Sequence, residues 1–181
     1  MIDAGSAPVA GAVNPIVLTV AATPRRQPRL SARGQLVLDL ESDTRWVRTA
    51  RSETAHVLVA WKIPRAIDEA QLIVSELVTN AVVHANGKRI EWVITYGESR
   101  LLIEVRDDSG HPPAPAPDGV LEEGGRGLLM VHTITADWGW WPLGEQSKST
   151  WAVLSVRGGE PCEPVQEHAP RRRAVGKVGS E

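Results

Sequence analysis

A stripe of polar residues runs along an otherwise apolar segment near the middle of the chain. Glu76, Asn80 and His84 lie four residues apart, so on a helix they would share one face. A carboxylate, an amide and an imidazole in apolar surroundings need partners, because burying unpaired polar groups costs free energy. A metal ion with phosphate oxygens would satisfy them. The same spacing also fits a helix face that simply meets water, and spacing alone leaves both interpretations open.

A second candidate position follows a β-rich run. Asp107 comes directly after Val105 and Arg106 and opens an acidic turn that continues through Asp108 and Ser109. A carboxylate at a strand end beside a pocket can accept a hydrogen bond from an exocyclic amine such as that of adenine. Asp and Ser after a strand are equally typical of an ordinary turn. By itself, the position fits either a base-binding site or a turn.

A third candidate is a glycine-rich loop in front of an apolar stretch. The run Gly124, Gly125, Arg126, Gly127 precedes Leu128. Glycines allow the backbone to approach a ligand closely, and a helix that begins here would aim free amide groups and its positive dipole end at an anion. The run matches neither G-x-x-x-x-G-K-S/T nor a G-x-G-x-x-G after a first strand. A phosphate site is therefore plausible, whereas a P-loop and a classical dinucleotide fold are disfavoured.

The periodicity of apolar residues predicts the elements that must position these groups. Helices are expected at about 44–59, from Asp68 to about Asn86, and at 128–134. Strands are expected at 36–40, 89–96, 101–106, 137–141 and 150–156, and the second and third form a hairpin. Hairpin strands without strict β-α-β alternation predict an α/β (α+β) sandwich with helices on one face of a mixed sheet. Four tryptophans on these strands are expected to pack the sheet: Trp92, Trp138, Trp140 and Trp151.

The two ends of the chain differ in composition from its middle. Residues 1–34 and 158–181 are rich in Gly, Pro, Ala and Arg and lack a sustained period, which is typical of disordered segments. The folded domain is expected at 35–157, with the basic triplet at 171–173 in a solvated tail. A chain of 181 residues has room for one ordinary domain, and its formal charge of −2 gives no reason to expect a nucleic acid partner.

The cysteine content and the hydropathy pattern restrict where the protein works. Cys162 is the single cysteine, so one chain can build neither a disulfide framework nor a thiolate metal cluster. No uninterrupted apolar run reaches the roughly 18 residues that a transmembrane helix needs, and the first residues do not resemble a signal peptide. We therefore expect a cytoplasmic protein with no membrane partner.

The order of these signals is more specific than any one of them. The chain has, in this order, a helix with Glu76 and Asn80, a hairpin ending in Asp107, the loop 125–127, and a last strand with Ser149 and Thr150. This order resembles the N-box, G1 box, G2 box and closing threonine of the GHKL (Bergerat-fold) ATPases. The amino-acid sequences of segments 76–81 and 124–128 are most similar to those of histidine-kinase-like ATP-binding domains of the anti-sigma-factor serine/threonine kinase type. The resemblance spans about residues 36–156 and implies a mixed, mostly antiparallel sheet.

The resemblance also implies ATP and Mg²⁺ as cofactors and assigns a role to each candidate residue. Glu76 would be the catalytic base that orients a serine hydroxyl or water towards the γ-phosphate, and Asn80 would coordinate Mg²⁺ that bridges the phosphates. His84 could also face the phosphates. The remaining nucleotide-binding residues would be Asp107 for the adenine amino group, Gly125, Arg126, Gly127 and Leu128 around the phosphates, and Thr150 near the adenine. In the G1 box, usually D-x-G-x-G, Ser109 and His111 replace the two glycines, which puts the shape of this loop in question.

Three functions are compatible with these residues. The first is an ATP-dependent serine/threonine protein kinase that phosphorylates an antagonist protein and binds a sigma factor, as the resembled family does. The second is a nucleotide-sensing module that holds a partner protein without turnover, and the third is an orphan ATPase. The presence of both Glu76 and Asn80 favours the kinase, since a degenerate module could have lost either. A homodimer is a further partner hypothesis.

Overall fold

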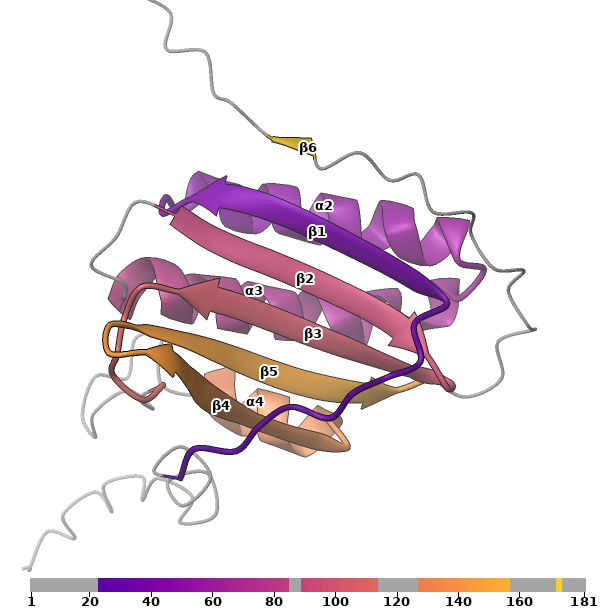
Figure 1. Ribbon diagram of the computed structural model, residues 1–181. Helices are drawn as coiled ribbons and strands as arrows, with labels where there is room; N and C mark the ends of the chain where they lie inside the picture. The colour runs from indigo at the N-terminus through magenta and orange to yellow at the C-terminus, as the bar shows by residue number, and fades with distance from the viewer. Residues whose placement is uncertain (1–22, 85–88, 114–126, 157–171, 174–181) are drawn as a thin grey trace, which may run out of the picture.

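The computed structural model describes residues 23–84, 89–113, 127–156 and 172–173, and its centre is one sheet (Figure 1). Five strands are antiparallel to their neighbours in the order β4-β5-β3-β2-β1, and a short sixth strand pairs in parallel with β1. The expected mixed, mostly antiparallel sheet is therefore confirmed. The strands are β1 (Gly34–Glu41), β2 (Arg89–Gly97), β3 (Arg100–Asp107), β4 (Asp137–Gly144), β5 (Ser147–Ser155) and β6 (Arg172–Arg173).

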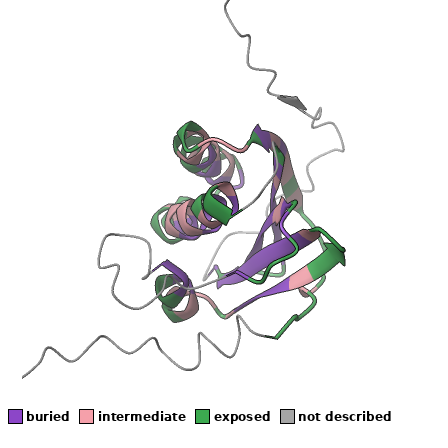
Figure 2. Ribbon diagram, turned by 90° about the vertical axis from the view of Figure 1, so that its left-hand side faces the viewer, coloured by how far each residue is buried: buried purple, intermediate pink, exposed green. Residues whose placement is uncertain are grey.

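All the α-helices of the described residues lie on one side of this sheet, as Figure 2 shows. They are α2 (Arg45–Ala60), α3 (Ile67–His84) and α4 (Gly127–Ile134), and a 3₁₀ turn, η1 (Pro64–Ala66), joins the first two. Helix α3 is central, since it packs against α2 and α4 as well as against β2, β3 and β5. The α+β sandwich is thus confirmed, and α3 carries its polar stripe over the middle of the sheet. No helix in the described ranges is long and apolar enough to cross a bilayer.

The hairpin between β2 and β3 sets where β3 ends. Glu98 and Ser99 both have positive φ angles, of 55° and 56°, as in the two-residue turns that match the twist of antiparallel strands. The turn fixes a register in which Tyr96 pairs with Leu101, and β3 continues to Asp107. Asp107 in turn pairs with Lys148 of β5. The last residue of β3 therefore lies beside the start of β5.

The helix-facing side of the sheet holds the main core. Leu101, Ile103 and Val105 of β3 and Ala152 and Leu154 of β5 belong to it, together with Trp92 and Trp138. Because side chains alternate along a strand, Asp107, Lys148 and Thr150 point to the same side. All four tryptophans expected to pack the sheet are buried.

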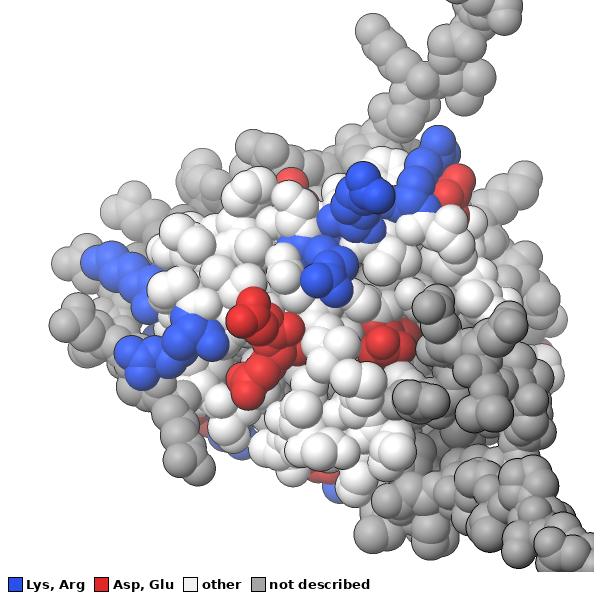
Figure 3. Space-filling view, turned by 180° about the vertical axis from the view of Figure 1, so that it is seen from behind, with Lys and Arg blue, Asp and Glu red and all other residues white. Residues whose placement is uncertain are grey.

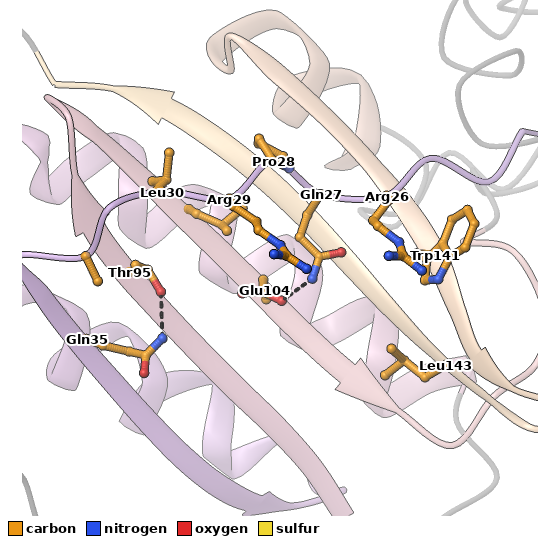
Figure 4. A pocket seen from close by; sticks show the side chains of 12 residues that line it. Arg26, Gln27, Pro28, Arg29, Leu30, Gln35, Thr95, Glu104, Trp141 and Leu143 are labelled. Carbon is orange, nitrogen blue, oxygen red and sulfur yellow. Dashed lines mark hydrogen bonds between the residues drawn. The ribbon is translucent and has the colours of Figure 1, made fainter.

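The opposite, outer side of the sheet has a smaller apolar cluster, made of Leu102, Trp151 and Val153 with Leu30 against it. Residues 23–33 cross this side, so the described part of the N-terminal segment contacts the sheet. An open cavity of about 420 Å³ lies between this segment and the strands, lined by Arg26, Gln27, Thr95, Glu104 and Trp141 among others. Figure 4 shows how these side chains lie. The domain boundaries at 34/35 and 157/158 remain predictions.

Candidate functional site

Glu76 of α3 and Gly127 at the start of α4 are in direct contact. A Cβ atom added to Gly127 would lie 2.0 Å from Glu76 Oε2 and 2.8 Å from its carboxyl carbon. A side chain at this position would require the Glu76 carboxylate to move, so Gly127 leaves room for that carboxylate. The structure thereby joins two motifs that are separated by fifty residues in the sequence.

The polar stripe of α3 divides into a half-buried part and an exposed end. Glu76 and Asn80 are half-buried, whereas His84 is exposed. Within the described ranges, none of the three side chains makes a hydrogen bond or an ion pair. Burial raises the pKa of the Glu76 carboxyl group above its ordinary value, because removal from water disfavours the charged form. Glu76 and Asn80 are therefore half-buried polar groups with hydrogen-bonding capacity that the described residues do not use.

The glycine loop is described only at its end. Gly127 begins α4 as expected, and the side chain of Leu128 is buried in the main core. Leu128 could therefore contact a phosphate only through its backbone, where the first amide groups of a helix have no partner within the helix. Gly125 and Arg126 lie outside the described residues, and their phosphate role remains a prediction.

Asp107 lies at the end of β3 in a buried ion pair. Its Oδ1 atom accepts hydrogen bonds from the Lys148 ammonium group and from the Ser109 backbone amide, each at 2.8 Å. The side chains of Asp107 and Lys148 are each 1% exposed. Desolvation raises the pKa of Asp107, while Lys148 and the Ser109 amide oppose that rise. Lys148 is thus a site residue that the sequence interpretation missed.

The loop after Asp107 is ordered by hydrogen bonds where the usual G1 box has glycines. Ser109 is buried; its amide donates to Asp107, and its Oγ accepts a hydrogen bond from the His111 amide at 3.3 Å. Gly110 lies so close to the β4–β5 turn that an added Cβ would be 2.5 Å from the Glu145 carbonyl oxygen. With Ser109 and His111 in place of the two glycines, the loop is therefore tight and holds Asp107 at the strand end.

Thr150 lies two residues beyond Lys148 on the same side of β5. Its Oγ1 atom is buried and has no hydrogen-bond partner within the described residues. An unpaired buried hydroxyl costs free energy, so this atom fits a polar group of a ligand. Asp107, Lys148 and Thr150 together form one polar group on β3 and β5, and Glu76, Asn80 and Gly127 form a second on α3 and α4. That the two groups are the two ends of one nucleotide site remains a prediction.

The donor set of the second group fits Mg²⁺ held jointly with phosphates. Mg²⁺ prefers oxygen ligands and usually binds through one or two protein groups plus substrate phosphates, and the amide oxygen of Asn80 has no hydrogen-bond partner in the part of the chain that the structure describes. Within the described ranges, no group of three or more His, Cys, Asp or Glu side chains could hold a metal ion. On the helix side of the molecule, acidic and basic side chains are interspersed (Figure 3).

A family comparison agrees with this geometry. Residues 40–149, more than half of the chain, match the family described as the histidine kinase-like ATPase domain. The chain therefore belongs to this family of ATP-binding domains, and the matched range includes Glu76, Asn80 and Asp107.

Comparisons with individual proteins add little to the family assignment. No curated protein matches the chain. Among solved structures, the Acinetobacter baumannii histidine kinase AdeS is similar, with 11% sequence identity, a TM-score of 0.39, and coverage of 79% of this chain and 75% of that chain. A likeness at that TM-score carries no functional argument.

Proposed function

We propose that this ATP-binding domain is a serine/threonine protein kinase of the anti-sigma-factor type. Its substrate would be a hydroxyl group on an antagonist protein, and a sigma factor would be its second partner. The observation that carries the proposal is the Glu76 carboxylate, which is half-buried, has no hydrogen-bond or ion-pair partner among the described residues and touches the first residue of α4. The resembled kinases have a catalytic base at this position of their N-box.

The resemblance to the GHKL ATPases supports a role for each residue in this proposal. Asp107 binds the adenine amino group, and the backbone at the start of α4 binds phosphate oxygens. The substrate hydroxyl attacks the γ-phosphorus, the bond to the β,γ-bridging oxygen breaks, ADP leaves, and the hydroxyl proton passes to Glu76. A raised pKa suits this role, because a general base works best when its pKa approaches the working pH. Mg²⁺ bound by Asn80 with the nucleotide would neutralise phosphate charge.

The test separates binding from phosphoryl transfer. Glu76→Gln keeps the size of the side chain and removes the base, so we expect ATP affinity to be retained and transfer to fall by roughly 10²-fold or more. Asn80→Ala should weaken Mg²⁺-dependent ATP binding and transfer together, because positioning of metal and phosphates dominates phosphoryl transfer. Phosphoryl transfer by both variants is measured with γ-labelled ATP and candidate antagonist proteins, and their ATP affinity is measured by calorimetry.

A matched control comes from the same helix. Glu69→Gln changes an exposed carboxylate in the first turn of α3 and should leave binding and transfer unchanged. Wild-type transfer rates in the Glu76→Gln variant would disprove the mechanism. A wild type that binds ATP but transfers no phosphate would support a binding module, and transfer to water alone would support an orphan ATPase.

A further inference from the structure

The Lys148 ammonium group has more hydrogen-bonding capacity than its surroundings use. A lysine ammonium group carries three N–H donors, and within the described residues Lys148 makes one hydrogen bond, to Asp107 Oδ1 at 2.8 Å. With 1% of the side chain exposed, water cannot easily serve the other two donors. A ligand that offers an acceptor beside Asp107 would satisfy one of them.

The partner carboxylate has unused capacity as well. Both hydrogen bonds to Asp107, from Lys148 and from the Ser109 amide, end on Oδ1. Oδ2 has no hydrogen-bond partner in the described part of the chain, and the nearby Thr150 Oγ1 is buried and unpaired. The pair therefore presents one free acceptor and at least one free donor on the same side of the sheet.

The edge of an adenine ring has the complementary pattern, since the N6 amine donates and the adjacent N1 accepts. We propose that Lys148 reads the base of ATP: its Nζ stays on Asp107 Oδ1 and donates a second hydrogen bond to adenine N1, while Asp107 Oδ2 accepts from the N6 amine. The proposal rests on the proposed adenine-binding role of Asp107. It adds a specificity-determining residue to that site.

A purely structural role explains the pair less well. Burying two charges costs desolvation free energy that their attraction only partly offsets, and apolar residues of similar size would often be equally stable here. Lys148 also opposes the desolvation that raises the pKa of Asp107. It thus helps to keep the carboxylate ionised, which makes it a stronger acceptor for the N6 amine.

The test compares ATP with 1-deaza-ATP, in which a C–H group replaces N1. Calorimetry on the full chain should show that the wild type binds ATP about 10- to 100-fold more tightly, because a hydrogen bond to a charged group contributes roughly this much to affinity. Lys148→Met should bind both nucleotides with equal affinity. Equal affinity of the wild type for both would overturn the proposal, as would undiminished discrimination by Lys148→Met.

Two further variants identify the reading group. Lys62→Met is the matched control, since Lys62 is an exposed lysine at the end of α2, and it should discriminate like the wild type. If Thr150→Val abolishes discrimination and Lys148→Met does not, Thr150 reads N1 and the proposal is wrong. Should Lys148→Met fail to fold, Lys148→Arg decides: a longer, planar cation would misplace the donor and reduce discrimination, and full retention would count against the proposal.

The failure of the inference can be told apart from the failure of the proposed nucleotide site. A purine riboside triphosphate, which lacks the N6 amine, tests Asp107 independently and should bind more weakly than ATP. If ATP binds more tightly than purine riboside triphosphate but no more tightly than 1-deaza-ATP, only the proposed role of Lys148 is wrong. If the wild type binds no ATP at all, the site assignment fails and the inference fails with it.

Discussion

The proposed adenine site makes stability and nucleotide binding depend on the same two side chains, Asp107 and Lys148. The pair is almost fully buried, and a buried charge without its partner is costly. The arrangement is stable only while both charges are present, although an apolar pair could fill the same space. This is the pattern expected where a site retains polar groups for a ligand and accepts a cost in stability.

The ion pair therefore supports a prediction about single and double variants. Lys148→Met leaves the Asp107 carboxylate buried without its cation and should lower the free energy of unfolding by about 3–5 kcal/mol. The double variant Lys148→Met/Asp107→Leu should recover most of this loss, because no unpaired charge remains, but it should no longer bind ATP. Urea denaturation at neutral pH and calorimetry measure the two effects. A double variant as unstable as the single one would contradict the explanation.

Glu76 supports a second prediction at the residue scale, about pH. Burial raises the folded-state pKa of Glu76 above its unfolded value. Between these two pKa values the folded state binds more protons than the unfolded state, so stability falls as the pH rises through this window. Glu76→Gln has no charge to desolvate and should be more stable than the wild type at neutral pH. The difference should disappear in acid, below the unfolded pKa of the carboxyl group. Thermal melts across pH check this, with the exposed Glu69→Gln as control; a gain that did not change with pH would exclude desolvation as its cause.

At the scale of the elements, the sequence predicted the helices and the hairpin well and the start of strand β5 poorly. Apolar periodicity identified α2 and α3 with small errors at their ends. Strand β5 was expected from Thr150 but begins at Ser147, because Ser147, Lys148 and Ser149 have the composition of a loop. Their pairing with the end of β3 compensates for that composition. This shortfall hid Lys148, although its alternation with Thr150, Ala152 and Leu154 was a usable signal.

The contacts of the candidate site were harder to predict than its residues. Glu76, Asn80 and Asp107 were found from motifs, because each motif is local in the sequence. The contact between Gly127 and Glu76 and the Asp107–Lys148 pair depend on how α3 packs against α4 and on how β3 pairs with β5. Spacing along the chain carries no information about such packing, so these contacts required the structure.

The contact between α3 and α4 leads to a third prediction. Gly127→Ala would place a methyl group 2.0 Å from Glu76 Oε2, so the carboxylate or α4 must move. We expect a loss of about 1–3 kcal/mol in stability and a large loss of phosphoryl transfer. Adding Glu76→Ala should restore stability but not transfer, as melting temperatures and γ-labelled ATP would show. Gly144→Ala, whose new Cβ would meet its nearest neighbour at 3.2 Å, is the control; equal effects of the two glycine variants would refute the steric argument.

At the scale of the whole molecule, the sheet separates two faces with different contents. The helix face carries the candidate site, and the outer face is covered in part by residues 23–33. Arg25 binds this segment to the sheet: its side chain pairs with Asp137, and its carbonyl oxygen accepts a hydrogen bond from Trp151 Nε1 at 2.7 Å. Gln27 donates to the buried Glu104, and Leu30 packs on the outer cluster. The segment therefore contacts the outer face of the sheet, on the side opposite the candidate site.

This separation gives the last prediction, which concerns truncation. Deleting residues 1–33 removes the contacts of Arg25, Gln27 and Leu30 and exposes Trp151, so the free energy of unfolding should fall by about 2–4 kcal/mol through lost apolar burial and hydrogen bonds. Tryptophan fluorescence should shift to the red, while the dissociation constant for ATP should change by less than about twofold, because the sheet lies between the segment and the site. Deleting residues 1–22 keeps all of these contacts and should leave stability unchanged. An unaltered urea midpoint after the longer deletion would show that the segment adds nothing to stability, and a large loss of ATP affinity would show that the two faces are coupled through the sheet.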